Sequence, residues 1–350
     1  MKILYGVQGT GNGHISRARK MAAHFRARGA DVTYLLSGRP REKLFDMEVF
    51  GDFEHRRGLT MVQENGRVDY WRTTLSTSGA QFIRDVRALN VGDFDLVITD
   101  FEPVTAWAAK TSGKTCMGIG HQYSFGHSIP RRGGNPVSAA VLRWFAPANI
   151  RLGLHWHHFN TATLPPIIDP DLNHREPREP FVLVYLPFED QRAVTQLLHS
   201  FGDKRFVQYA PELVDSSDGN VALRKTCLDG FRNDLQQAHA VICNAGFELV
   251  AECLHLGIPT LVKPVQGQME QISNAFALQQ LQWGTALETL DRKAIAAWLA
   301  NGARCPSVRY PDVAAALVDW VLDGEWSDQS ELWETLWACT RTRERLAATI

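Results

Sequence analysis

The stretch of sequence that decides the fold is residues 240–264, AVICNAGFELVAECLHLGIPTLVKP. Apolar residues run without interruption through Ala240–Cys243, which is typical of a strand buried on both faces. After a short turn, residues Phe247–Leu256 carry a helical pattern, and a second apolar run follows at Thr260–Lys263. The stretch therefore predicts two strands of a parallel sheet joined by a helix that covers it.

The same alternation extends along the chain on both sides of a proline-rich segment, residues 160–180, which we interpret as an interdomain linker. The further strands that we expect are Ile3–Val7, Val32–Leu36, Phe94–Thr99, Cys116–Ile119, Phe181–Leu186 and Arg205–Tyr209. We therefore predict an α/β fold of two Rossmann-like domains, residues 1–165 and 166–326. Residues 327–350 form an amphipathic helical tail in this prediction.

Length and composition limit the classes of protein. A chain of 350 residues suggests two domains, and its 45% hydrophobic and 21% charged residues exclude wholesale disorder. Its 37 Lys and Arg against 38 Asp and Glu argue against a nucleic-acid partner or charge-driven membrane binding. The six cysteines show no zinc spacing, and most lie in apolar runs as reduced thiols would.

The chain begins with a short apolar run that leads directly into glycines, unlike a signal peptide. No stretch approaches the roughly 20 apolar residues that span a bilayer. We therefore expect a cytoplasmic protein without a transmembrane segment, for which a peripheral membrane contact stays open.

A glycine-rich turn, Gly9-Thr10-Gly11-Asn12-Gly13-His14, connects the first expected strand to the first helix. Glycines let another molecule approach the backbone, and the N–H groups at a helix start attract anions. The turn lacks the third glycine of the dinucleotide fingerprint and the Gly-Lys-Ser/Thr of a phosphate-binding loop. It does lie at the carboxyl edge of the sheet, where ligands bind in open α/β folds.

His14 and Asp100 are the candidate catalytic pair. Asp100 ends the expected strand Phe94–Thr99 and so reaches the same sheet edge as His14. A carboxylate that accepts the imidazole N–H would fix its tautomer and raise its basicity, as a general base requires. Two structural alternatives stay open: His14 caps or packs against the first helix, and Asp100 caps a helix that begins near Pro103.

A second candidate site follows from the decisive stretch itself. Ala245 and Gly246 place small residues and N–H groups at a helix start, where a diphosphate would be stabilised. Glu252 lies within two turns on that helix and could accept two hydrogen bonds from a ribose diol. Glu270 and Gln271 follow the second strand at the same ligand edge.

These motifs together resemble the GT-B glycosyltransferases, especially the UDP-glycosyltransferases and the MurG-like C-terminal domain of glycosyltransferase family 28. The positions that match the C-terminal motif are Gly246, Glu252, Pro259, Pro264, Gln271, Asn274 and Ala275. The turn that ends in His14 is similar to the first loop of that superfamily. One position departs: Leu249 replaces a phosphate-contacting Ser/Thr, so phosphate binding would rest on backbone amides with Asn244.

The resemblance implies two domains whose parallel sheets face each other across a cleft, with residues 327–350 crossing back to the first domain. It implies a role for each candidate residue. The donor-binding residues are Asn244, Ala245, Gly246, Phe247, Glu252, Glu270 and Gln271, with Glu252 on the ribose and Glu270 and Gln271 on the sugar. The acceptor and cleft residues are Gly11, Asn12, Gly13, His121 and Gln122, beside the catalytic His14 and Asp100.

The function that the resemblance implies is transfer, with inversion, of a hexosyl or N-acetylhexosaminyl group from a nucleotide-diphosphate sugar. UDP is the expected nucleotide, and the acceptor hydroxyl belongs to a glycan, a lipid-linked molecule or a small molecule. Two alternatives remain: a UDP-N-acetylglucosamine 2-epimerase-like enzyme and a non-catalytic nucleotide-sugar-binding protein. No cofactor is implied. His155 and His157 have ligand-like spacing, but no third ligand accompanies them, so we expect no metal site.

Overall fold

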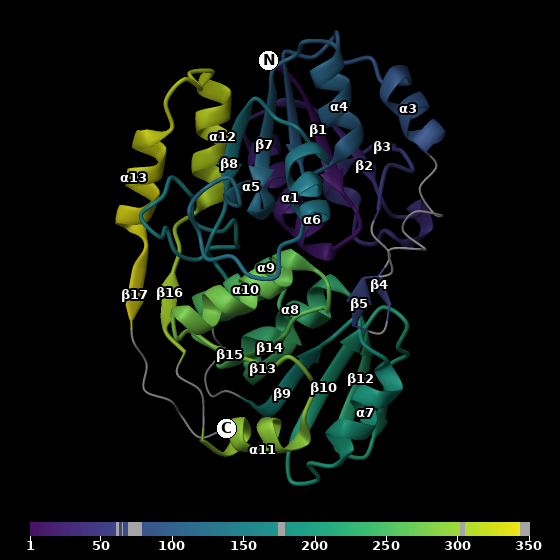
Figure 1. Cartoon of the computed structure of the whole chain (residues 1–350), viewed down its shortest axis with the longest axis vertical. Coiled ribbons are helices and arrows are strands. Elements are labelled where there is room, and N and C mark those ends of the chain that lie inside the picture. Colours follow the sequence, from purple (N-terminus) through teal and green to yellow (C-terminus); the bar gives the residue numbers. More distant parts are fainter. Residues whose placement is uncertain (61–62, 65, 69–78, 174–178, 302–304, 344–350) are drawn as a thin grey trace.

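The protein forms two large sheets in separate halves of the molecule, and a computed structural model describes both (Figure 1). The described residues are 1–60, 63–64, 66–68, 79–173, 179–301 and 305–343. The first sheet has six strands in the order β3-β2-β1-β6-β7-β8, and the second has seven in the order β11-β12-β10-β9-β13-β14-β15. The predicted α/β fold of two Rossmann-like units is confirmed.

The first sheet is parallel throughout and is covered by helices on both faces. Its strands are β1 (Lys2–Gln8), β2 (Asp31–Ser37), β3 (Glu54–His55), β6 (Leu96–Asp100), β7 (Cys116–Gly120) and β8 (Ile150–Gly153). Its helices are α1 (Asn12–Ala27), α3 (Gly79–Ala88), α4 (Pro103–Thr111), α5 (His121–Ser124) and α6 (Pro136–Trp144). A separate hairpin pairs β4 (Gln63–Glu64) with β5 (Arg67–Val68).

The second sheet is parallel except for its edge strand β11, which runs antiparallel to β12. Its strands are β9 (Glu179–Tyr185), β10 (Arg205–Ala210), β11 (Ser216–Asp218), β12 (Val221–Lys225), β13 (Ala238–Asn244), β14 (Thr260–Lys263) and β15 (Thr285–Ala286). Its helices are α7 (Gln191–His199), α8 (Leu228–Gln237), α9 (Phe247–Leu256), α10 (Met269–Gln280) and α11 (Arg292–Asn301). The decisive stretch of sequence forms β13, α9 and β14 at the predicted positions, because its apolar residues are buried in the sheet.

The segment between the two sheets packs more tightly than its prolines suggest. The chain leaves the first sheet after Gly153 and enters the second at Glu179, and the expected domain boundary at residues 165–166 falls between them. Leu164, Ile167 and Ile168 are at most 2% exposed. The segment does join the two halves, and apolar side chains between its prolines anchor the crossing to the core.

The C-terminal part of the chain crosses back onto the first half. Helices α12 (Val313–Asp323) and α13 (Ser330–Cys339) lie beside the first sheet in Figure 1, with the short pair β16 (Ser307–Arg309) and β17 (Arg341–Arg343) below them. Arg28, the residue that follows α1, forms an ion pair with Asp319 of α12. The indole N–H groups of Trp333 and Trp337 donate to the carbonyls of Thr161 and Thr163, at 2.9 and 2.6 Å. The crossing begins with α12, which precedes residue 327, the position that the sequence predicts for its start.

Glu102, and not Asp100, caps helix α4. Its buried carboxylate accepts hydrogen bonds from the backbone N–H groups of Val104 and Thr105, at 2.8 and 2.7 Å. It also accepts from the hydroxyls of Ser37 and Thr105, at 2.6 and 2.7 Å. Burial raises the pKa of Glu102, although these donors oppose the rise. Asp100 is thereby left free for other partners.

We predict that Glu102→Ala lowers the free energy of unfolding by about 2–4 kcal/mol, because the substitution leaves several buried donors without an acceptor. Urea denaturation measures the loss. Glu102→Gln keeps an oxygen for the α4 N–H groups and serves as the matched control, with a smaller expected loss. Equal stability of wild type and Glu102→Ala would contradict this role for the cap.

Candidate active site

A cavity of about 490 Å³ lies where strands of both sheets end, with Gln8 of β1, Tyr185 of β9 and Asn244 of β13 among its lining residues. Helices α1 and α9, one from each half, both begin at this cavity. Their N-cap residues, Gly11 and Gly246, provide no side-chain hydrogen bond to the helix. The first N–H groups of a helix have no partner within it and carry partial positive charge, so both walls of the cavity favour an anion.

His14 and Asp100 form the hydrogen-bonded pair that their positions predict. His14 Nδ1 lies 2.7 Å from Asp100 Oδ1, with Asp100 fully buried and the His14 side chain 15% exposed in the cavity wall. An ionised carboxylate can only accept, so Nδ1 carries the proton of this hydrogen bond. The other ring nitrogen, Nε2, is then unprotonated in neutral imidazole and can accept a proton.

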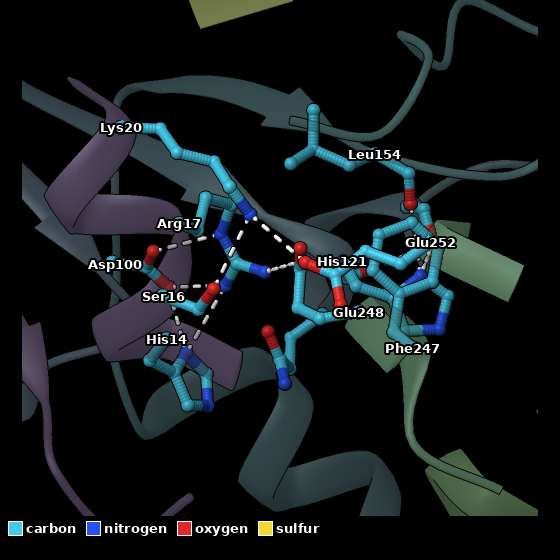
Figure 2. A network of polar contacts seen from close by, with 12 residues as sticks. His14, Ser16, Arg17, Lys20, Asp100, His121, Leu154, Phe247, Glu248 and Glu252 are labelled. Atoms are coloured by element: carbon cyan, nitrogen blue, oxygen red, sulfur yellow. Dashed lines mark hydrogen bonds and ion pairs between the residues drawn. The ribbon is translucent and has the colours of Figure 1, made fainter. Parts of the chain in front are cut away.

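Arg17 links this pair to the other half of the molecule. Its Nε and Nη2 atoms donate to Asp100 Oδ2 and Oδ1, at 2.8 and 2.5 Å. Its Nη1 donates to Glu248 of α9. Figure 2 shows Arg17 between these two carboxylates, with His14 on one side and Lys20 on the other. Arg17 is 2% exposed and Glu248 is 7% exposed, so this network is shielded from solvent.

The two carboxylates of the network have opposite pKa shifts. Burial by itself would raise the pKa of Asp100, but Arg17 and His14 outweigh it and hold this pKa below its usual value. Burial also raises the pKa of Glu248, with Glu252 adding to the rise, and here Arg17 and Lys20 do not outweigh it. Asp100 is therefore ionised. For Glu248, the nearby cations only partly offset the cost of burying its charge.

Glu252, the expected ribose ligand, pairs with a lysine from the first half. Lys20 Nζ lies 3.3 Å from Glu252 Oε1, and both side chains keep partial exposure, at 17% and 18%. Lys20 also donates to Ser16 Oγ at 3.2 Å. Partly exposed ion pairs of this kind contribute little stability, so a ligand can displace the lysine at small cost.

Two side-chain hydrogen bonds bridge the halves beside the network. His121 Nε2 lies 2.7 Å from Asn274 Oδ1, and its Nδ1 lies 2.8 Å from the carbonyl of Leu154. Gln122 Nε2 donates to Glu270 Oε2 at 2.9 Å. His121 is 1% exposed and both its nitrogens face protein atoms, so it holds the two halves together in this arrangement.

Comparison with known proteins identifies the family of this chain. A family model described as glycosyl transferase family 1 matches residues 1–302. The chain belongs to glycosyl transferase family 1. It is therefore an enzyme that transfers sugars, which confirms the predicted class of enzyme. A comparison with curated protein sequences found no match.

Solved glycosyltransferase structures share the fold of this glycosyltransferase. The spinosyn rhamnosyltransferase SpnG aligns with a TM-score of 0.58 and 15% identity, over 96% of this chain and 100% of that one. SnogD from Streptomyces nogalater aligns at 0.50 and 18%, over 97% and 99%. MurG of Acinetobacter baumannii aligns at 0.52 and 12%, over 97% and 100%. These alignments confirm the predicted GT-B fold.

The remaining donor-side candidates of the glycosyltransferase also line the cavity or support its wall. Asn244 donates to the carbonyl of Lys263 at 3.0 Å and to Glu189 Oε1 at 3.2 Å. The carbonyl of Ala245 accepts from Asn274 at 3.0 Å. The Phe247 ring stacks on His121 with centroids 4.1 Å apart. Gln271 Oε1 accepts the N–H of Val265 at 3.0 Å, which fixes the turn before α10.

The acceptor-side candidates form the opposite wall. Gly11 and Gly13 lie at the start of α1 and line the cavity. Asn12 donates to the hydroxyl of Tyr185, from the second sheet, at 3.0 Å, and accepts from Arg39 at 2.8 Å. Aromatic side chains complete the cavity wall at Phe45, Phe101, Phe145, Phe188 and Phe231.

Five buried oxygens in the cavity residues have no hydrogen-bond partner in the described part of the chain. They are Gln122 Oε1, Thr226 Oγ1, Asn244 Oδ1, Glu248 Oε2 and Gln268 Oε1. A buried polar atom without a partner costs free energy, and such atoms in native proteins generally have a reason. All five can accept a hydrogen bond, so a ligand rich in hydroxyl groups would satisfy them.

Sequence reasoning missed Arg17, Lys20 and Glu248. Arg17 follows His14 by three residues, and Glu248 precedes Glu252 by four, so each shares a helix face with a candidate that the sequence did indicate. Helical periodicity could have found them. The buried charge pair between the two halves could not be found this way, since it depends on how α1 and α9 meet.

The histidine run does not gather as a ligand set. The Nδ1 atoms of His155, His157 and His158 accept backbone N–H groups at 2.9, 3.0 and 2.9 Å. Within the described ranges, no three His, Cys, Asp or Glu side chains are placed to hold a metal ion. None of the helices that the structure describes has both the length and the apolar character for crossing a membrane.

We predict that Arg17→Met lowers the free energy of unfolding by about 3–5 kcal/mol, because it leaves two buried carboxylates without their cation. Urea denaturation of the whole chain measures it. Glu248→Gln is the matched control: its amide oxygen still accepts from Arg17, so we expect a change below about 1 kcal/mol. Equal losses for the two variants would show that Arg17 does not hold the network.

Proposed function

We propose that this glycosyltransferase moves a sugar, with inversion, from a nucleotide-diphosphate sugar to an acceptor hydroxyl. UDP is the expected nucleotide. The observation that carries the proposal is the placement of His14, paired with Asp100, in the same cavity as the start of α9. A proton acceptor and an anion-stabilising helix end thus meet in one cavity, as displacement of a diphosphate requires.

The donor diphosphate would bind at the N-terminus of α9. The N–H groups that follow Gly246 point into the cavity wall without a side-chain cap, and the helix dipole adds partial positive charge. Leu249 supplies no hydroxyl, so the backbone carries this contact in the proposal. Because negative charge grows on the diphosphate as it leaves, the same N–H groups stabilise the transition state more than the ground state.

His14 would act on the acceptor. Its Nε2 takes the proton of the acceptor hydroxyl while that oxygen bonds to the anomeric carbon and the bond to the diphosphate breaks. A single displacement from the opposite face inverts the anomeric configuration. Asp100 holds the ring through Nδ1–H and stabilises the imidazolium that forms, without taking the proton itself.

Glu252 would hold the ribose, and Glu270 with Gln271 and the unpartnered oxygens of the cavity would receive hydroxyls of the sugar. Ribose hydroxyls would replace Lys20 at Glu252. The acceptor would lie between the glycine-rich turn and the aromatic walls, and glycan, lipid-linked and small-molecule acceptors stay open. The family favours transfer over the epimerase-like and non-catalytic alternatives.

For the donor site, we predict that Glu252→Ala weakens binding of UDP by about 1–3 kcal/mol, through the loss of charge-assisted hydrogen bonds to the ribose. Isothermal calorimetry with UDP and UDP-sugars measures the loss, after a thermal-shift screen of nucleoside diphosphates has identified the preferred base. Glu270→Ala is the matched comparison: it should weaken the sugar nucleotide and spare free UDP. Unchanged UDP affinity in Glu252→Ala would remove Glu252 from the site.

For the base, we predict that His14→Ala lowers transfer about 10²–10⁴-fold and leaves donor affinity nearly unchanged. The wild-type rate should rise with pH as the imidazole loses its proton and then level off, because only neutral imidazole accepts a proton. Release of the nucleoside diphosphate, with acceptors or with water, measures the rate. A folded His14→Ala enzyme with near-normal turnover would return His14 to a structural role at the start of α1.

A further inference from the structure

Glu248 is a buried carboxylate of α9 that the proposed reaction does not use. Its Oε1 accepts from Arg17, and its Oε2 has no partner among the described residues. Burial raises its pKa, so keeping it ionised has a cost. Nothing in the packing of the second half requires a charged group here, because the only cation in hydrogen-bond contact with it, within the described chain, comes from the first half.

The glycine-rich turn is shaped to admit this side chain. A Cβ atom on Gly13 would lie 3.0 Å from Cγ of Glu248, so a larger residue at position 13 would push the carboxylate away. Gly13 immediately precedes His14, and Arg17 lies one turn further along the same helix. The start of α1 thus brings the carboxylate of α9, the arginine and the imidazole into one group (Figure 2).

We propose that Glu248 sets the basicity of His14 through Arg17, and therefore that the base is strongest only when the two halves of the enzyme are closed on each other. The inference rests on the proposed function, in which His14 is the general base. In this scheme Glu248 is a positioning residue, since it acts through Arg17 and Asp100 and does not touch substrate.

Solvent does not screen the charges of this buried network. Arg17 and Asp100 alone sum to zero charge, so Arg17, whose Nη2 lies 3.2 Å from His14 Nδ1, offsets part of the stabilisation that Asp100 gives to an imidazolium at His14. When Glu248 also pairs with Arg17, the three groups sum to −1, and the imidazolium is favoured. Because Glu248 belongs to α9 and Arg17 to α1, this extra charge reaches the base only in the arrangement of the halves seen here.

The other charged or titratable groups around the network do not replace Glu248. Lys20 and Glu252 pair with each other and are partly exposed, so their opposite charges largely cancel. Tyr5 of β1 is fully buried and neutral, since burial raises the pKa of its phenol well above its usual value. His121 of α5 has burial as the main cause of its lowered pKa, which keeps its ring neutral beside Arg17. Glu248 is therefore the remaining group whose charge raises the basicity of His14.

The test follows the imidazole itself and needs no acceptor. The full chain is labelled at the ring carbon Cε1 of its 12 histidines, the His14 signal is assigned with His14→Gln, and its titration is followed by NMR. In Glu248→Gln we expect the midpoint of the His14 titration to fall by about half a pH unit to one unit. The conservative Glu248→Asp keeps the charge, so its His14 midpoint should lie close to that of the wild type.

The matched control is Asp319→Asn, which removes another carboxylate, one that pairs with Arg28 at the far end of α1 from His14. Its midpoint should equal that of the wild type. In Glu248→Gln the acid limb of the pH–rate profile should also move to lower pH, whereas loss of a mere contact between the halves would change KM without moving that limb.

The outcomes separate the inference from the function on which it rests. If the His14 midpoint does not move in folded Glu248→Gln while His14→Ala is inactive, Glu248 does not set the basicity of His14, and His14 remains the base. An equal fall in Asp319→Asn overturns the inference too, because the effect is then general. Normal turnover of His14→Ala overturns both. If the His14 midpoint falls in Glu248→Gln but not in Asp319→Asn, and His14→Ala is inactive, the result supports the proposal that Glu248 acts on His14 through Arg17.

Discussion

The arrangement of the site depends on one buried cation. Arg17 lies almost without exposure between Asp100 and Glu248, and a guanidinium in such a place is tolerated because carboxylate oxygens accept its hydrogen bonds. The three groups come from α1, β6 and α9, so their pairing fixes how the two halves approach each other. The orientation of His14 follows from the same constraint, since Asp100 is shared between the arginine and the imidazole.

The cavity adds a second electrostatic constraint. Helices α1 and α9 both direct their N-termini at it, and neither start has a side-chain cap within the described chain. Two positive helix ends that converge repel each other, and an anionic ligand between them relieves the repulsion. Glu248 and Glu252 lie on the first turns of α9 and reduce the same repulsion through Arg17 and Lys20.

Hydrogen bonds and a ring contact join the two halves beside the site. His121 with Asn274, and Gln122 with Glu270, form hydrogen bonds there, and Phe247 stacks on His121. The C-terminal helices instead fasten themselves to the first half through buried apolar residues and the two indole hydrogen bonds of Trp333 and Trp337. The residues that fasten the C-terminal helices thus lie far along the chain from the glycine-rich turn and from the start of α9.

The sequence by itself determined two largely parallel sheets and indicated His14 and Asp100 as a candidate pair. Short apolar runs that alternate with helical patterns are typical of a parallel sheet covered on both faces, and the carboxyl ends of its strands share one edge. It also indicated Glu252 and the start of α9, through local helix chemistry. The roles of Arg17 and Glu248, and the packing of Leu164, Ile167 and Ile168 within a proline-rich segment, were decided only by the tertiary structure. A charge becomes informative once it is buried, and burial depends on which distant element covers it, which no local pattern records.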